Sequence, residues 1–490
     1  MVFGSYFDAM VPDQREQERL LPALHQRHEL GDLLVPELVL AEVVELVAAI
    51  VAADGAPNAL GGLGARLSYR AEREIPELIE NLRGAPDALA FLLAACVYEG
   101  LNQRLVREEA DRLLKLSGDR LTALLPGTDS QGAERADRPN PGFVFRRSLT
   151  ELLHAVHAVR QEREIRTEGA YAHSVQAVVF VRHRQAEAVL RHVWCEYGQL
   201  SELLVEWLRE VNRASELTRS VGQFMGRAAS WGGGGHALRH LQALAESERM
   251  TSRLIAANAL GIAAEDPVLV AEVRYRLHRW SLAASFRLRT TVAYACGAEF
   301  GLSRPDLALQ LLHALLLGVR RRQGEEGHGD EGRVVLAVRV AIISLFQAGN
   351  EARVFGRLLE WLGTEQCDRE QALSLFGQLL QYPDWFIRKL ADKTPESGLM
   401  VEAIRRALNE ESSFEATCAA LLRWADWGQW DDMVFRAVEN LFAALARSMR
   451  SGEFRLFVEL DDKGTAGWAG LGTARASLSR WRAGEQREAV

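Results

Sequence analysis

Ser247-Glu-Arg-Met-Thr-Ser-Arg253-Leu-Ile-Ala-Ala-Asn-Ala-Leu-Gly261 has a second copy in Ala283-Ala-Ser-Phe-Arg-Leu-Arg289-Thr-Thr-Val-Ala-Tyr-Ala-Cys-Gly297. The two arginines are 36 residues apart, and so are the two closing glycines. A repeat of this length, with small residues inside each helix, is typical of stacked helical pairs in which each pair buries one face on the next. The sequence therefore predicts a mainly α fold that contains an α-solenoid.

The helix expected over 250–262 has one face made of residues that recur every three or four positions, namely Leu254, Ala257, Leu260 and Gly261. Alanine and glycine there predict close approach of a neighbouring helix, and Arg253 is expected to bridge to acidic groups or carbonyls of the adjoining unit. The pattern Arg253 with Ala256-Ala257-Asn-Ala259-Leu-Gly261 resembles the second helix of HEAT-type repeats. Arg289 to Gly297 is a looser match. This resemblance implies HEAT-like packing over 237–320 and 333–448.

The composition is that of an ordinary globular protein. Of the 490 residues, 48% are apolar and 25% are charged, and the formal net charge is −8 at pH 7. A chain of this length is expected to form roughly two to four domains. The mildly acidic balance argues against a protein that coats nucleic acid or an anionic membrane over its whole surface.

Three features favour a cytoplasmic location. The cysteines are scattered and never form a CxxC pair, which is typical of buried free thiols in a reducing compartment: Cys96, Cys195, Cys296, Cys367 and Cys418. The start MVFGSYFDAM lacks the basic and apolar runs of a signal peptide. The longest apolar segment, Val334–Phe346, contains Arg339 and is too short to span a bilayer, so we expect a core helix and no membrane association.

Helical periodicity covers most of the chain. Helices are expected at 36–53, 70–83, 87–98, 103–116, 143–163, 186–194, 200–211, 333–348, 351–362, 369–381, 398–408, 413–425 and 431–448. Val175–Val181 is the best strand candidate, because it is short and rich in β-branched residues. The glycine-rich polar stretches 126–142 and 323–333 predict loops, and the second is expected to be mobile and acidic. The tail from Asp461 is expected to be less regular.

Four segments precede the repeats, and they read Ala90-Phe-Leu-Leu-Ala-Ala-Cys-Val-Tyr-Glu-Gly100, Val106-Arg-Glu-Glu-Ala-Asp-Arg-Leu-Leu114, Val178-Val-Phe-Val-Arg-His183 and Ala188-Val-Leu-Arg-His-Val-Trp194. Their order resembles the helical and winged-helix arm of actinobacterial STAND proteins, which are signal-transduction ATPases with a HEAT-like C-terminal array. The resemblance covers roughly residues 60–450. With the composition shifts it divides the chain into an N-terminal helical region (1–85), a winged-helix-like region (86–215), HEAT-like repeats (216–460) and a tail (461–490).

STAND proteins normally carry a P-loop ATPase core upstream, and the sequence contains no P-loop. A Walker A loop needs Gly-Lys-Ser/Thr, so that backbone amides and the lysine surround the phosphates. The chain has four lysines and none follows a glycine: Lys115, Lys389, Lys393 and Lys463. We therefore expect no room for the ATPase core, no ATP binding through a P-loop, and no bound cofactor.

Two histidine pairs have spacings that suit a metal. His154 and His157 lie three residues apart in the helix expected there, and His236 and His240 lie four apart. No HExxH motif or paired cysteine completes either pair, so solvent-facing or capping histidines are the favoured interpretation and no metal site is predicted. His183 follows the candidate strand, where a STAND winged helix can place a nucleotide-sensing histidine. That role would require an ATPase partner.

The segment 143–192 is basic within an acidic protein, with eight arginines against five glutamates. A winged helix with a basic face could contact DNA. The favoured alternative is an ion-paired helical surface, because Arg160, Arg163 and Arg166 interleave with two glutamates.

The C-terminal tryptophans offer a second candidate surface. Trp424, Trp427 and Trp430 recur at intervals of three. Packing between repeats is the favoured interpretation, and an exposed ridge that binds a partner is the alternative. The chain has no Gly-x-Ser-x-Gly elbow or other local nucleophile signature, so no catalytic residue is predicted.

The leading hypothesis is a non-enzymatic, cytoplasmic helical-repeat protein that binds another protein. It would act as the regulatory or sensing arm of a STAND-like signalling or defence system, and a separately encoded P-loop ATPase is one expected partner. Stacked helices form extended curved surfaces that suit this role. The alternative is a winged-helix regulator that associates with nucleic acid through residues 86–195.

Overall fold

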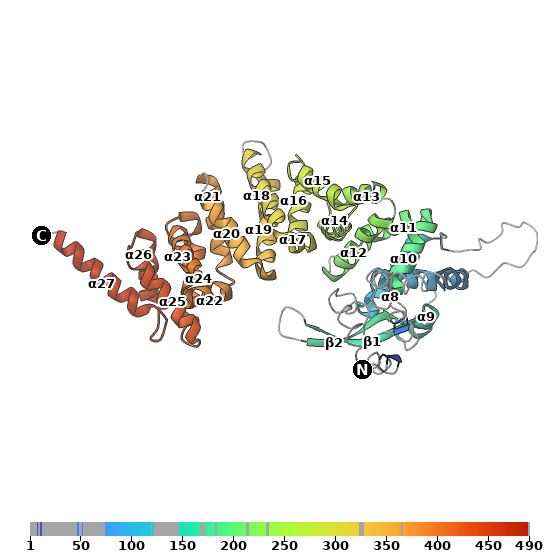
Figure 1. The fold of residues 1–490 in the computed structure, drawn as a ribbon, viewed down its shortest axis with the longest axis horizontal. Helices are drawn as coiled ribbons and strands as arrows, with labels where there is room; N and C mark the ends of the chain where they lie inside the picture. The colour runs from blue at the N-terminus through green and yellow to red at the C-terminus, as the bar shows by residue number, and fades with distance from the viewer. Residues whose placement is uncertain are drawn as a thin grey trace, which may run out of the picture. The chain divides into compact units, whose positions relative to one another are not determined.

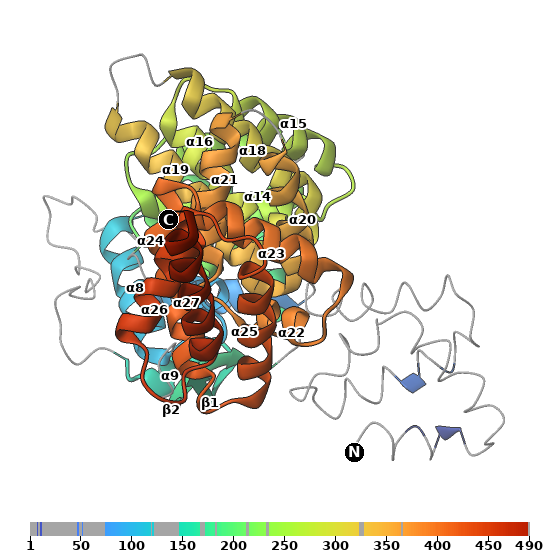
Figure 2. The same cartoon turned by 90° about the vertical axis from the view of Figure 1, so that its left-hand side faces the viewer.

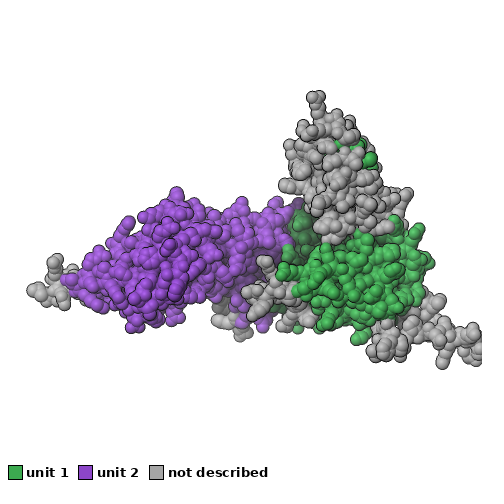
Figure 3. All heavy atoms as spheres, turned by 90° about the horizontal axis from the view of Figure 1, so that it is seen from below, with its two compact units in different colours: residues 1–269 green, residues 270–490 purple. Residues whose placement is uncertain are grey.

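The structure, a computed structural model, describes most of the chain from residue 74 onward (Figure 1). The described residues are 7, 10, 11, 47, 48, 51, 74–118, 120–121, 147–166, 172–181, 184–211, 215–231, 235–322, 328–363 and 366–488. They belong to two compact units, residues 1–269 and 270–490, which Figure 3 colours separately. Both units are mainly helical, which confirms the predicted fold class. The expected loop 126–142 and most of the expected helix 36–53 lie outside the described residues.

Unit 1 combines helices with a two-stranded sheet. After helical residues 74–82 its elements are α7 (Pro86–Val97), α8 (Gln103–Ser117), α9 (Leu149–Ala155), β1 (Ala158–Arg166), β2 (Ala172–Phe180), α10 (Gln185–Glu196), α11 (Gly198–Arg209), α12 (Ser215–Trp231), α13 (Gly235–Ala245) and α14 (Met250–Ala263). The strands form an antiparallel hairpin in which Ala158 pairs with Phe180. An isolated bridge joins Asn102, just before α8, to Ala177 of β2. The hairpin lies beside α9 (Figures 1 and 2).

The hairpin confirms one prediction and corrects another. The strand predicted at 175–181 is β2, but the helix predicted at 143–163 is wrong beyond Ala155, where α9 ends. His157 follows with a left-handed φ of 57°, a conformation that ends a helix. The charged side chains described in β1 are exposed, whereas Val175 and Val178 of β2 are buried. The apolar strand β2 offers β1 a partner, and this tertiary pairing overrides the helix-like charge pattern.

A buried polar cluster ties α7, α8 and α11 together. The Tyr98 hydroxyl donates a hydrogen bond of 3.3 Å to Glu109, which is only 7% exposed. Arg112 pairs with the same carboxylate and donates to the Trp207 carbonyl oxygen at 2.6 Å. Burial and the neighbouring Glu109 charge raise the pKa of Tyr98, so the hydroxyl stays protonated and remains a donor.

The closest helix contact in unit 1 joins α12 to α14, and glycines on α12 permit it. A Cβ atom at Gly226 would lie 2.6 Å from the Ile262 Cβ and 2.7 Å from the Ala259 carbonyl oxygen. A Cβ at Gly222 would collide with the Asn258 side chain. The predicted close approach to the 250–262 helix is therefore confirmed, and the glycines that allow it are four residues apart on the facing helix.

The secondary-structure elements described in unit 2 are all helices. Its elements are α15 (Val270–Ser281), α16 (Phe286–Cys296), α17 (Glu299–Ser303), α18 (Pro305–Arg322), α19 (His328–Leu345), the π-helical turn η1 (Phe346–Asn350), α20 (Glu351–Leu362), α21 (Gln366–Leu379), α22 (Asp384–Ala391), α23 (Pro395–Leu408), α24 (Glu411–Trp427), α25 (Asp432–Leu445), α26 (Ser451–Lys463) and α27 (Leu471–Glu488). The helices predicted between 333 and 448 all have counterparts here.

Stacking in unit 2 joins helices that are three elements apart. α15 packs on α18, α16 on α19, α21 on α24, α22 on α25 and α23 on α26. Helices two elements apart also pack on one another, as α16 does on α18 and α21 does on α23.

Two segments expected to be irregular are helical. The predicted acidic loop 323–333 is wrong from His328 onward, where α19 begins, and residues 323–327 lie outside the described part. The tail after residue 461 forms the end of α26 and then α27, which packs on α25 and α26. Leu471, Ala474 and Leu478 are buried in that contact, so burial compensates for a weak local helical signal.

Among the described residues, one helical run, Gly329–Leu362, has the length and apolar character needed to cross a membrane. It comprises α19, η1 and α20, and Gly349 with φ of 88° interrupts it. Val334, Val338 and Ile342 of α19 are buried, whereas Leu336 and Val340 are exposed. One face of α19 therefore lies in the core of unit 2, as the sequence predicted for residues 334–346.

Candidate interaction surface

Arg253 and Gly261, the marked positions of the first repeat copy, lie on α14 and are buried. The Arg253 Nη1 donates hydrogen bonds of 2.8 and 2.9 Å to the carbonyl oxygens of Ser247 and Glu248. These carbonyls belong to the turn that precedes α14, so Arg253 stabilises the N-terminal end of its own helix. The predicted bridge from Arg253 to an adjoining unit is not made by these hydrogen bonds, and the buried Arg253 Nε has no hydrogen-bond partner in the described part of the chain.

In the second copy, Arg289 forms a bridge of the kind that was predicted for Arg253. Arg289 on α16 is 1% exposed and makes two hydrogen bonds, of 2.6 and 2.7 Å, to the carboxylate of Glu331 on α19. Gly297, at the end of α16, faces the same neighbour, because a Cβ there would lie 2.9 Å from the Ala341 Cα. Glu331 lies inside the stretch expected to be a loop, so the sequence identified the arginine but not its partner.

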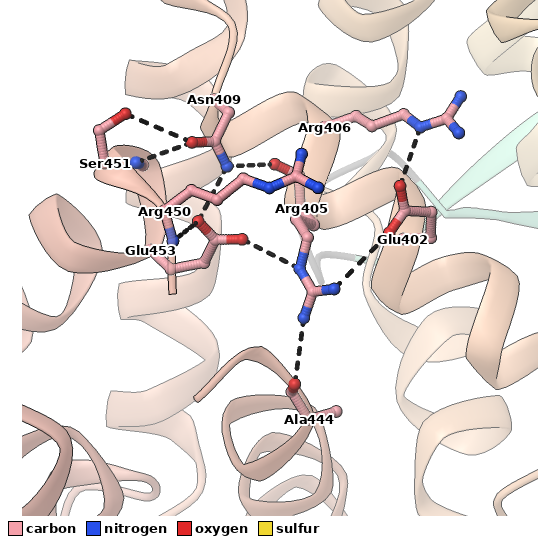
Figure 4. Close-up of polar contacts among 9 residues, drawn as sticks. Glu402, Arg405, Arg406, Asn409, Ala444, Arg450, Ser451 and Glu453 are labelled. Carbon is pink, nitrogen blue, oxygen red and sulfur yellow. Dashed lines mark hydrogen bonds and ion pairs between the residues drawn. The ribbon is translucent and has the colours of Figure 1, made fainter. Parts of the chain in front are cut away.

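A related joint between α23 and α26 was not predicted (Figure 4). The Arg405 Nε donates to the Glu453 carboxylate at 3.0 Å, and its Nη2 donates to the Ala444 carbonyl oxygen at 3.1 Å. Glu453 is fully buried and also accepts from the Arg450 backbone amide and the Asn409 side chain. Every group is paired, so this cluster is a structural joint and offers no open position for a ligand.

The three tryptophans singled out in the sequence do not form one ridge. Trp424 is 2% exposed, and its indole N–H donates to the Leu380 carbonyl oxygen at 3.1 Å. Its ring centroid lies 6.2 Å from that of Phe386, in an aromatic core shared by several helices. For Trp424 the favoured interpretation, packing between helices, is correct.

The other two tryptophans lie at the surface. Trp427 ends α24 and is 39% exposed, and Trp430 in the turn before α25 is 82% exposed. Met433 and Phe435 on α25 are 37% and 40% exposed. We call these four side chains the tryptophan turn. Large apolar groups gathered within nine residues on a folded surface are typical of a site that binds another macromolecule.

The tail of the chain fixes the shape of the tryptophan turn. The Ala469 amide donates to the Ala425 carbonyl oxygen at 3.0 Å, and a Cβ at Gly428 would lie 2.7 Å from the Ala469 Cβ. Asp431 caps α25 by accepting the amides of Met433 and Val434. Segments on both sides of the turn are anchored, so the exposed Trp430 side chain projects from a turn whose backbone is fixed by these contacts.

Three of the four cysteines whose side chains the structure describes are buried. Burial raises the pKa of Cys96 and of Cys296, and it raises the pKa of Cys418 to about 11, so these thiols stay protonated. Cys195 is exposed, against the expectation that all five cysteines are buried, and the side chain of Cys367 lies outside the described part.

The histidine pairs do not form a metal site in the described part of the chain. His157 has left α9, so His154 and His157 do not share a helix. His240 lies on α13, while the side chain of His236 and all of His183 lie outside the described residues. The described residues contain no group of three potential metal ligands.

Comparisons with known proteins identify no family. No protein-family description matches the chain, and no curated protein matches its sequence.

Proposed function

We propose that this chain is a non-enzymatic protein-interaction or regulatory protein that docks its partner on the tryptophan turn. The observation that carries this proposal is the exposure of Trp430, 82% on an anchored turn. Exposing an indole in water costs free energy that burial against a partner would recover, at about 25 cal/mol per Å² of apolar surface. Tryptophan is also the residue most enriched among the energetic centres of protein interfaces.

The charges beside the tryptophan turn indicate the chemistry of the partner. Asp426 and Asp432 are exposed and flank Trp430 in the chain, and Asp431 lies between. Indole faces and carboxylates both attract arginine and lysine side chains. The partner segment is therefore expected to be cationic, with apolar side chains that pack on Trp427 and Phe435.

The broader role follows the resemblance to STAND proteins, as a sensing or regulatory arm in a cytoplasmic signalling or defence system. The order α7, Asn102 bridge, α8, α9 and hairpin supports a winged-helix-like region, and the stacked helices of unit 2 support a HEAT-like array. Because the sequence has no P-loop, a separately encoded P-loop ATPase is the first partner to test, and an adjacent reading frame is the place to seek it.

The test compares Trp430→Ala with Leu336→Ala, since Leu336 is another exposed apolar residue of unit 2, at 61%. A purified partner, either the neighbouring ATPase or a protein retained from lysate by the immobilised chain, is titrated against each variant. We expect Trp430→Ala to weaken binding by at least about tenfold, which corresponds to about 1.4 kcal/mol. Equal affinities for the wild-type chain and Trp430→Ala would refute the tryptophan turn as the docking site.

The alternative function is nucleic-acid binding through the hairpin region. Arg160 and Arg163 are exposed on β1, which favours it, but Glu162 and Glu164 are exposed on the same strand and oppose it. Labelled duplex DNA at low and moderate salt separates the two functions. DNA binding that weakens steeply with salt, and is lost in Arg160→Gln with Arg163→Gln, would favour the alternative.

A further inference from the structure

A polar cavity of about 430 Å³ lies within unit 1, where α7, the hairpin, α10 and α12 converge. Its charged lining residues are Glu99, Arg163, Arg184, Glu187 and Arg227. Its apolar lining includes Phe180, Leu190, Phe224 and Trp231. The volume is in the range that holds small molecules in proteins.

The arginines in this cavity are not balanced by the glutamates. Arg227 pairs with Glu187 at 3.6 Å, and Glu99 accepts the Phe180 amide at 3.2 Å. Within the described residues, the Arg163 side chain donates only to the neutral amide of Gln161, at 3.3 Å. The Arg184 side chain forms no hydrogen bond or ion pair with any residue in the described part of the chain. Two guanidiniums without a carboxylate partner therefore face the cavity, and its three arginines and two glutamates give the charged lining a net charge of +1.

Backbone features lie beside both arginines. Gly100 has φ of 81°, a conformation that favours glycine, and a Cβ there would lie 3.0 Å from the Arg163 Nη1, so this turn lies against the guanidinium. Arg184 is the N-cap residue of α10 and makes no side-chain capping bond. The partial positive charge at the start of α10 adds to that of the two arginines.

We propose that this cavity, the arginine pocket, binds a small organic phosphate monoester. A phosphate monoester carries nearly two negative charges at neutral pH, which matches the two available guanidiniums better than a carboxylate does. Arginine forks bind phosphate oxygens in pairs. The organic part would pack against Phe224 and Trp231. No P-loop is needed, because side chains and not a glycine-rich loop supply the donors. This inference is independent of the tryptophan turn.

The test is calorimetric titration of the full chain with four probes: AMP, glucose 6-phosphate, inorganic phosphate and adenosine. We expect saturable binding of at least one monoester and none of adenosine. The two esters distinguish a nucleotide from a sugar phosphate as the organic part. Because the second phosphate pKa is about 6, the affinity should rise as the pH rises from about 5 to 7.

The variants are Arg184→Gln and Arg163→Gln, with Arg191→Gln as the matched control on α10 outside the cavity. We expect each pocket variant to weaken monoester binding by at least about tenfold and the control to change it by less than about twofold. Trp430→Ala should bind the monoester normally, which separates this inference from the proposed docking function. The proposal would be overturned if neither monoester binds saturably at concentrations up to about 10 mM, which means a dissociation constant weaker than the millimolar range. Equal monoester affinity for Arg184→Gln and the wild-type chain would also overturn it.

Discussion

The joints α16–α19 and α23–α26 use the same ion pair in different surroundings. In both, an arginine reaches a glutamate in the first turn of the stacked helix, where the helix dipole favours a negative charge. Glu331 is 15% exposed on its side chain and is bound by Arg289, whereas Glu453 is fully buried and is also bound by Asn409 and a backbone amide. Both joints also contain a close glycine contact: a Cβ at Gly297 would lie 2.9 Å from the Ala341 Cα, and a Cβ at Gly452 on α26 would collide with the Leu408 carbonyl of α23.

This difference shows how the burial of an ion pair determines the stability that is lost when the pair is broken. A carboxylate with no access to water depends on its protein partners for all of its hydrogen bonds. A partly exposed carboxylate that loses its protein partners can form hydrogen bonds with water instead. We therefore expect the α23–α26 joint to lose more stability than the α16–α19 joint when its ion pair is broken.

The largest effect is expected for Glu453→Ala. Removing this fully buried carboxylate leaves the Arg405 Nε, the Asn409 side-chain amide and the Arg450 backbone amide without their acceptor, and breaking a buried pair in this way costs about 3–5 kcal/mol. Urea unfolding followed by circular dichroism measures the loss. Glu402→Ala is the control, because its pairs with Arg405 and Arg406 are more exposed and are worth about 0–1 kcal/mol. Equal losses in the two variants would contradict the role of burial.

The next effect is expected for Arg289→Met, which keeps the apolar length of the side chain and removes its charge. The charge-assisted bonds to Glu331 predict a loss of about 2–3 kcal/mol. A double-mutant cycle with Glu331→Gln isolates the pair and should give a coupling energy of at least about 1 kcal/mol. Additive losses would mean that the two side chains stabilise the joint separately.

Gly297→Val tests how much the close packing of α16 on α19 contributes to stability. The new side chain must displace the α19 backbone at Ala341, which costs about 1–3 kcal/mol through overpacking. Gly356→Val on α20 is the matched control, because a Cβ at Gly356 meets nothing within 4 Å. If both variants unfold at the same urea concentration, the close contact does not limit stability.

The smallest effect on stability is expected for Trp430→Ala, at most about 0.5 kcal/mol, because the indole is exposed. Trp424→Ala removes a buried indole from the same segment and should cost about 3–5 kcal/mol. Thermal unfolding of the two variants measures the contrast. A large loss in Trp430→Ala would mean that the tryptophan turn supports the fold and is not reserved for a partner.

The sequence alone determined the helical class, most helix positions in unit 2 and the β2 strand, and it singled out Arg289 and Gly297 as repeat positions. These properties depend on residues three or four positions apart, so they can be recognised in a short window. It also indicated that a neighbouring helix would approach α14 closely. The sequence did not show which residue or helix each of these features contacts.

Only the tertiary structure decided which residues meet. Glu331 became the partner of Arg289 because α19 begins earlier than its glycine-rich sequence suggested, and Gly222 and Gly226 became the contact for α14. Trp424 and Trp430 have the same chemistry and lie six residues apart, yet one is buried and the other is exposed. The physical reason is that burial, strand pairing and ion pairing are properties of the elements that surround a residue, and those elements come from distant parts of the chain.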